Sequence, residues 1–142
     1  MDSQTDVAER AARDELSAYT LTHGDRSFMH QHVVDAWAAQ QATPESKAIG
    51  VAFALIGLYL HLERGYSGRD VQRAHIRFGR RRREWPAFDP PAERGALTTV
   101  DVMRSSPGPE RDRAIEEWCA SVWEAWDASH ERVAALLREL GE

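Results

Sequence analysis

The histidines are the residues of this 142-residue chain whose type and placement point most directly to chemistry. His23, His30 and His32 fall in one ten-residue stretch, and His61 and His75 follow in separate helical segments. A neutral imidazole can bind a metal, and its ionisation near neutral pH suits acid–base chemistry. Two interpretations follow: imidazoles from several helices converge on a metal or polar ligand, or each one hydrogen-bonds separately inside the core.

The spacing of His30 and His32 argues against a chelate made by one helix. Successive helical residues are about 100° apart, so these two side chains point about 200° apart if both are helical. His32 and Asp35, three residues apart, share one side of the helix. A histidine and a carboxylate at that spacing can bind one ion, or the carboxylate can orient the imidazole. Residues from other helices must complete any site here.

Two other segments place histidines at or near the core. His75 lies in the apolar stripe of its predicted helix, and His61 closes the apolar run of residues 49–62. If these helices converge, their imidazole and carboxylate groups predict a pocket for a divalent metal, zinc by default or iron, manganese or nickel. The expected metal ligands are His30, His32, Asp35, His61 and His75. The expected contacts to a small-molecule ligand are His23, Tyr59 and Arg77.

An enzymatic role would use the same pocket. The expected reaction class is metal-assisted hydrolysis or a related Lewis-acid reaction, with Glu15 or Glu63 as the base. The His-Glu-x-x-His pattern of zinc proteases and the paired Glu-x-x-His of di-iron bundles are both missing from the sequence. Cys119 is the only cysteine, which excludes an intramolecular disulfide and a cysteine-rich zinc module and favours a cytoplasmic location.

An arginine-rich segment offers an alternative function. Asp70 is the only acid between Arg64 and Arg83, a stretch that contains eight arginines. This segment could form a non-catalytic binding module for an anionic ligand or an acidic partner, or a solvated face paired with the acidic final helix. The net charge of −5 argues against nucleic acid as the partner.

Helical periodicity predicts how these residues are positioned. The pattern indicates an all-α fold, a compact bundle of about five helices in a single domain over residues 1–142. Asp25 or Ser27 could cap the second helix, and Thr43 with Pro44 is typical of the start of the third. Ser67 with Asp70 resembles a capping box for the fourth.

One long C-terminal helix is expected to close the bundle. Its apolar residues alternate spacings of four and three, a heptad seam formed by Ile115, Cys119, Val122, Trp126, Ser129, Val133, Leu136 and Leu140. Core packing is favoured over a dimer zipper because Cys119 and Ser129 suit a zipper poorly, and a homodimer remains an alternative. The apolar run of residues 49–62 is shorter than the roughly 20 residues needed to cross a bilayer, and no secretory signal is expected.

Four segments carry a more specific pattern: residues 19–23 (YTLTH), 27–36 (SFMHQHVVDA), 49–63 (IGVAFALIGLYLHLE) and 118–123 (WCASVW). They resemble an uncharacterised family of small bacterial, largely actinobacterial, helical proteins, a domain of unknown function. The resemblance runs from Glu15 to Leu137 and implies no activity. Family members usually read Tyr-His-Glu-Leu and then cysteine where this chain has Arg-Asp-Glu-Leu-Ser-Ala at residues 13–18, which weakens the expectation of a metal near the first helix.

Overall fold

The computed structural model describes residues 3–23 and 27–142, and these residues form helices with no strand among them. The expected all-helical fold is confirmed. In the described residues the chain forms seven α-helices and one short 3-10 helix: α1 (Ser3–Thr22), α2 (His30–Gln40), α3 (Ala48–Arg64), α4 (Gly68–Arg81), α5 (Thr99–Met103), α6 (Pro109–Ala125), η1 (Asp127–Ser129) and α7 (His130–Glu139). The expected number of about five is too low, in part because the expected long last helix is divided into α6 and α7.

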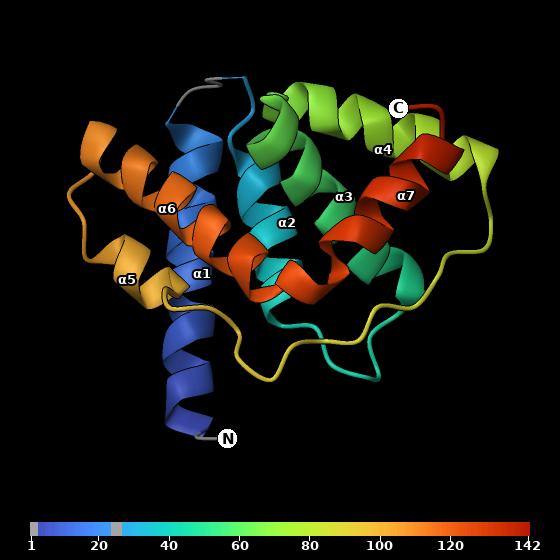
Figure 1. Cartoon of the computed structure of the whole chain (residues 1–142). Helices are drawn as coiled ribbons and strands as arrows, with labels where there is room; N and C mark the ends of the chain where they lie inside the picture. The colour runs from blue at the N-terminus through green and yellow to red at the C-terminus, as the bar shows by residue number, and fades with distance from the viewer. Residues whose placement is uncertain (1–2, 24–26) are drawn as a thin grey trace.

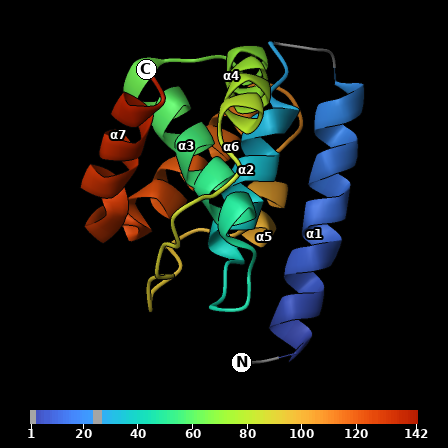
Figure 2. The same cartoon turned by 90° about the vertical axis from the view of Figure 1, so that its right-hand side faces the viewer.

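Helix α2 lies at the centre of the bundle, with α1, α3, α4 and α6 packed around it (Figures 1 and 2). Its residues Val33, Ala36 and Ala39 are buried, and so are His32 and Asp35. Helix α1 stands at one side of the bundle, and its N-terminal part extends past the other helices (Figure 2). The central position of α2 brings its polar residues into contact with the surrounding helices.

Two of the predicted helix starts have different outcomes. The capping box at α4 is confirmed, because the Ser67 side chain accepts from the Asp70 amide while the Asp70 carboxylate accepts from the Ser67 amide. The third helix begins at Ala48 and not at Pro44. Thr43 instead forms a local turn, in which its hydroxyl accepts from the Glu45 amide. Threonine side chains stabilise such turns as readily as helix starts, so the prediction was wrong.

The expected long C-terminal helix is interrupted at Trp126. The Trp126 ring is buried and its Nε1 donates to the Ala39 carbonyl 3.2 Å away, which anchors the end of α6 on α2. The 3-10 turn Asp127–Ser129 follows, and then α7. His130 stacks on Trp123 with ring centroids 3.8 Å apart, and its Nε2 lies 2.7 Å from the Trp123 carbonyl. The Trp123 carbonyl also accepts from the Trp126 amide at 3.0 Å, so it has two partners at the break. No proline or glycine in the sequence marks this break.

The apolar seam of α6 and α7 faces the core, as expected. Ile115, Cys119, Val122 and Leu136 are all buried in the main hydrophobic cluster. Because these residues are buried, the seam packs within one molecule and is not available as a dimer zipper.

None of the helices described for this chain is both long and apolar enough to cross a membrane.

One buried amide ties three parts of the fold together. The Oε1 of Gln40 accepts from Trp118 Nε1 at 3.0 Å, and its Nε2 donates to the carbonyls of Arg94 and Leu97 at 2.9 and 2.7 Å. Gln40 is 2% exposed. This side chain links α2 to α6 and to the long segment between α4 and α5, and buried partners would be left unsatisfied without it.

Replacing Gln40 by methionine should lower the free energy of unfolding by about 2–4 kcal/mol, because a buried indole N–H and two carbonyls lose their partner. Urea denaturation measures this loss. Gln72→Met, at an exposed position of α4, is the matched control and should change stability by less than about 0.5 kcal/mol. Equal effects of the two substitutions would contradict the assigned role of Gln40.

Candidate functional site

Three helices bring polar side chains together at one end of the core. The His32 ring on α2 stacks on the His61 ring on α3, with ring centroids 3.5 Å apart and planes 17° apart. The His61 Nε2 lies 2.8 Å from both carboxylate oxygens of Glu116 on α6, and its Nδ1 lies 2.8 Å from the Tyr66 carbonyl. We call His32, His61 and Glu116 the outer layer of the site.

The hydrogen-bond partners of His61 indicate its charge. Both of its ring nitrogens face oxygens that act as acceptors, the Tyr66 carbonyl and the Glu116 carboxylate, so each nitrogen carries a hydrogen. Burial opposes this charge, but the bonds to Glu116 and to Tyr66 outweigh it and raise the pKa of His61. Burial likewise opposes the charge of Glu116, and the bond to His61 outweighs it and lowers that pKa. Both shifts favour an imidazolium paired with a carboxylate.

His32 is a neutral imidazole. Burial, and after it the positive charge of His61, lower the pKa of His32 to about 4. Neither ring nitrogen of His32 has a hydrogen-bond partner within residues 3–23 and 27–142. His32, a neutral imidazole with an unused acceptor nitrogen, therefore stacks on the His61 ring.

A second set of residues lies one helical turn deeper. Asp35 follows His32 by three residues, Gly57 precedes His61 by four, and Cys119 follows Glu116 by three, so each shares a helix face with its outer-layer residue. We call Asp35, Gly57 and Cys119 the inner layer. A Cβ at Gly57 would lie 1.9 Å from Asp35 Oδ2, so the absence of a side chain there makes room for the carboxyl group.

The inner layer is held neutral. Burial raises the pKa of Asp35 well above its usual range, although a 3.1 Å hydrogen bond from Gln31 Nε2 to Oδ1 lowers it in part. The other oxygen, Oδ2, is buried without a hydrogen-bond partner in the described part of the chain. Burial also raises the pKa of the Cys119 thiol, which lies 3.8 Å from the His32 carbonyl. Burial thus favours the protonated forms of both the carboxyl group and the thiol beneath the outer layer.

The turn that precedes α2 is attached to the start of α4. Ser27 and Phe28 both adopt left-handed conformations, with φ values of 64° and 65°. The Ser27 carbonyl accepts from the Arg69 amide at 3.0 Å, which ties this turn to the start of α4. Ser27 does not cap α2, whose N-cap is Met29 without a side-chain bond. The alternative cap, Asp25, lies outside the described residues.

The other predicted histidines have partners of their own. His30 Nδ1 lies 2.9 Å from Thr20 Oγ1 on α1. His75 Nε2 lies 2.8 Å from the Phe53 carbonyl, and the two rings stack with centroids 4.8 Å apart. His23 stacks on Tyr19 near α6. The structure therefore brings His32 and His61 together and places His30, His75 and His23 in separate contacts.

The remaining predicted residues also have separate positions. Glu15 is exposed on α1, and Glu63 accepts a 2.9 Å hydrogen bond from Trp123 Nε1. Tyr59 packs edge-on against Trp123, and Arg77 pairs with Glu142. Glu116, which the sequence placed on the acidic outer face of the last helix, is the outer-layer residue that sequence reasoning missed. Its spacing of three residues from Cys119 was the available signal.

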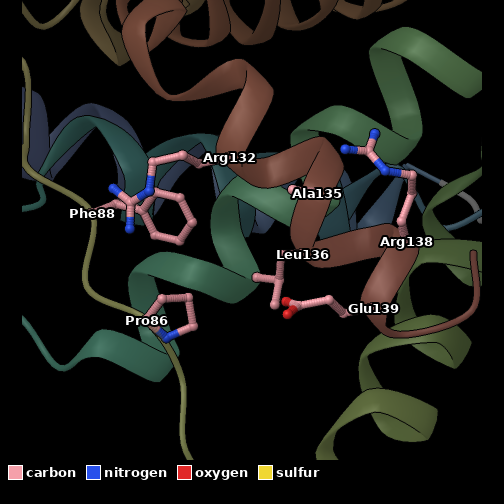
Figure 3. A pocket seen from close by; sticks show the side chains of 7 residues that line it. All are labelled: Pro86, Phe88, Arg132, Ala135, Leu136, Arg138 and Glu139. Atoms are coloured by element: carbon pink, nitrogen blue, oxygen red, sulfur yellow. The ribbon is translucent and has the colours of Figure 1, made fainter.

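No group of three or more His, Cys, Asp or Glu side chains in residues 3–23 and 27–142 is arranged to hold a metal ion as it stands. A hollow of about 610 Å³ lies elsewhere, between α7 and the segment containing Pro86 and Phe88 (Figure 3). There the Arg132 guanidinium lies 4.6 Å from the Phe88 ring centroid and donates to the Ala87 carbonyl. These contacts attach the segment to α7, so we ascribe a structural role to them.

Comparison with known proteins places the chain in a family. Residues 10–127 match a family described as a family of unknown function (DUF5946). This chain belongs to that family. The match includes all residues of the outer and inner layers, and it confirms the resemblance to an uncharacterised domain. No curated protein and no solved structure matches the chain.

Gly57→Ala should lower the free energy of unfolding by about 2–3 kcal/mol, because the new Cβ overlaps the Asp35 carboxyl group. In an Asp35→Ala background the same change should cost less than about 1 kcal/mol, since the obstructing group is gone. Gly50→Ala is the control on the same helix. A Cβ at that position would meet no atom of another part of the chain within 4 Å, so the substitution should be neutral or stabilising. An equal cost of Gly57→Ala in both backgrounds would contradict this packing.

Asp35→Asn should remove a pH dependence of stability. Because burial raises the folded-state pKa, the contribution of Asp35 to stability is greatest below the pKa of the unfolded carboxyl and declines as pH rises toward the folded value. That decline can reach about 1.4 kcal/mol per pH unit. Urea denaturation from pH 4 to 8, in about one-unit steps, should show it in the wild type and in the exposed control Asp89→Asn. Its persistence in Asp35→Asn would disprove the assignment.

Proposed function

We propose that this protein binds a divalent transition-metal ion, with zinc as the first candidate, at the His61–Glu116 pair. The orientation of His61 carries the proposal: Nδ1–H donates to the Tyr66 carbonyl, and Nε2 points at a carboxylate. Metal-binding histidines usually donate one N–H to a carbonyl or carboxylate and offer the other nitrogen to the ion. An ion would replace the proton that now lies between Nε2 and Glu116.

Accessibility and charge support the same position. The Glu116 side chain is 44% exposed and that of His61 is 16% exposed, so an ion could reach this pair from solvent. The carboxylate is already ionised by its pairing with His61, as a metal ligand must be. Two imidazole nitrogens and one carboxylate would suit zinc, iron, manganese or nickel with open positions, and a bound ion there would supply Lewis-acid chemistry.

His32 is the third ligand in this proposal. It is neutral and its nitrogens have no hydrogen-bond partner among the described residues, so a lone pair is available without deprotonation. Its ring must turn first, because the lone pairs of two nearly parallel stacked rings do not meet at one point. Of the expected ligands, this proposal keeps His32 and His61 and adds Glu116 in place of Asp35, which lies in the inner layer. The separate contacts of His30 and His75 favour structural roles for them.

Calorimetric titration of chelator-treated protein with Zn²⁺, and with Co²⁺ as a spectroscopic probe, should show one ion per chain. His61→Ala and Glu116→Gln should each weaken binding by about tenfold or more. Affinity should fall as pH falls below neutral, because the ion competes with the proton on His61.

His75→Ala is the matched control, because that imidazole is also partly buried but contacts only Phe53. It should leave the metal affinity unchanged within about twofold. Saturable binding that His75→Ala weakens as much as His61→Ala would contradict the assigned ligands. A chain that binds neither ion would contradict the proposed function itself.

A further inference from the structure

Two exposed stripes of opposite charge have the same spacing on two helices. The arginine stripe on and just after α4 consists of Arg73, Ile76, Arg80 and Arg83. The acidic stripe on and just after α6 consists of Glu117, Ala120, Glu124 and Asp127. In both stripes the steps are three, four and three residues, and the first three residues of each stripe share one helix face. Arg83 follows the extended Arg82, and Asp127 begins the 3-10 turn after α6.

The two stripes also have the same position relative to their helix ends. Helix α4 ends at Arg81 and α6 ends at Ala125, so each stripe begins eight residues before its helix ends and finishes two residues after it. All eight residues are exposed. Ile76, at 52% exposure, is one of the few large apolar side chains on the surface, and the residue at the same position of the acidic stripe is the small Ala120.

Most of the charge on these stripes is not neutralised within the molecule. In the part of the chain that the structure describes, Arg80, Arg83, Glu117 and Glu124 have no ion-pair or hydrogen-bond partner. The other two charges have only local partners: Arg73 lies 3.6 Å from Asp70, and Asp127 lies 3.8 Å from His130. The four unpaired charges remain available to another molecule.

Neighbouring arginines of the same segment pair with carboxylate groups. Arg77 pairs with Glu142, and Arg82 pairs with Glu139 at 3.5 Å. Both partners are carboxylates of the acidic C-terminal segment of the same chain. In the described residues α4 packs on α2 and α3 and not along α6, so the matching acidic stripe does not cover the arginine stripe of its own molecule.

We propose that α4 of one copy pairs in parallel with α6 of a second copy through these stripes. The parallel alignment places Arg73 opposite Glu117 and Arg80 opposite Glu124 along the helices. The same alignment brings Arg83 and Asp127, each two residues past its helix end, to the same end of the contact. It also packs Ile76 on Ala120, which buries the exposed aliphatic group against a small residue. The antiparallel alignment would put Ile76 against Glu124 and Arg80 against Ala120, so the parallel one is selected by both charge and size.

This pairing joins different surfaces of the two copies. A closed two-fold dimer would contain it twice, and a pairing that does not close would extend to larger assemblies. Exposed ion pairs are individually weak and are screened by salt, so the association should depend on protein concentration and ionic strength. It does not involve the proposed metal ligands and stands independently of them.

Sedimentation velocity over a range of protein concentrations tests the proposal. At about 0.01 M salt the wild type should have a weight-average mass above the 16.1 kDa of one chain, and it should return to that mass at about 1 M salt, where the screening length is only ~3 Å. Arg80→Glu/Arg83→Glu and Glu117→Arg/Glu124→Arg should each be monomeric at low salt. An equimolar mixture of the two variants, or all four changes in one chain, should restore association.

Arg10→Glu/Arg138→Glu is the control for Arg80→Glu/Arg83→Glu. It makes the same change in net charge, at exposed arginines outside the stripes, and this control should associate like the wild type. Restoration by the four changes together also shows that the substituted chains fold. The proposal is overturned if the wild type is monomeric at low salt at every concentration. It is also overturned if the control loses association as the stripe variants do, or if the four combined changes fail to restore it.

Discussion

The contact between Asp35 and Gly57 sets how closely α2 and α3 approach, and the rest of the polar site depends on that distance. Without a Cβ on Gly57, the α3 backbone lies directly against the Asp35 carboxyl group. One helical turn nearer the surface, at the position before Asp35 in α2 and after Gly57 in α3, the same distance between the helices lets the rings of His32 and His61 stack at 3.5 Å. A side chain at Gly57 would part the helices where the stacking requires them to be close. The glycine therefore serves the geometry of the histidine pair as much as the packing of the core.

The charge of the site decreases with depth. Glu116 and His61, at the surface end, form an ion pair, whereas burial favours the neutral forms of His32 beside them and of Asp35 and Cys119 beneath them. Burying an unpaired charge is costly, which accounts for the neutral forms of the deeper ionisable groups. The consequence is that the His61–Glu116 pair lies at the solvent-facing end of the site. The neutral groups beneath it determine its position without adding charge.

The sequence predicted the features of the fold that arise from local interactions. The capping box of Ser67 and Asp70 and the apolar seam of α6 and α7 depend on residues a few positions apart, and the structure confirms them. The break at Trp126 could not be predicted in this way. It depends on a hydrogen bond to Ala39, which is distant in sequence, and no helix-breaking residue accompanies it. Tertiary contacts thus decided where a continuous helical pattern ends.

The candidate site shows the same limit. Periodicity indicates which face of a helix a residue occupies, but not which depth of that face meets a neighbouring helix. His75 has the expected inward placement, yet its ring packs on Phe53 of α3, whereas the ring of His32 on α2 packs on His61 of α3. The two histidines therefore contact α3 at different positions along its length. The sequence does contain three related pairs, His32 with Asp35, Gly57 with His61, and Glu116 with Cys119, each spaced by three or four residues. Their alignment into two layers is a property of how three helices pack, and a single helix cannot reveal it.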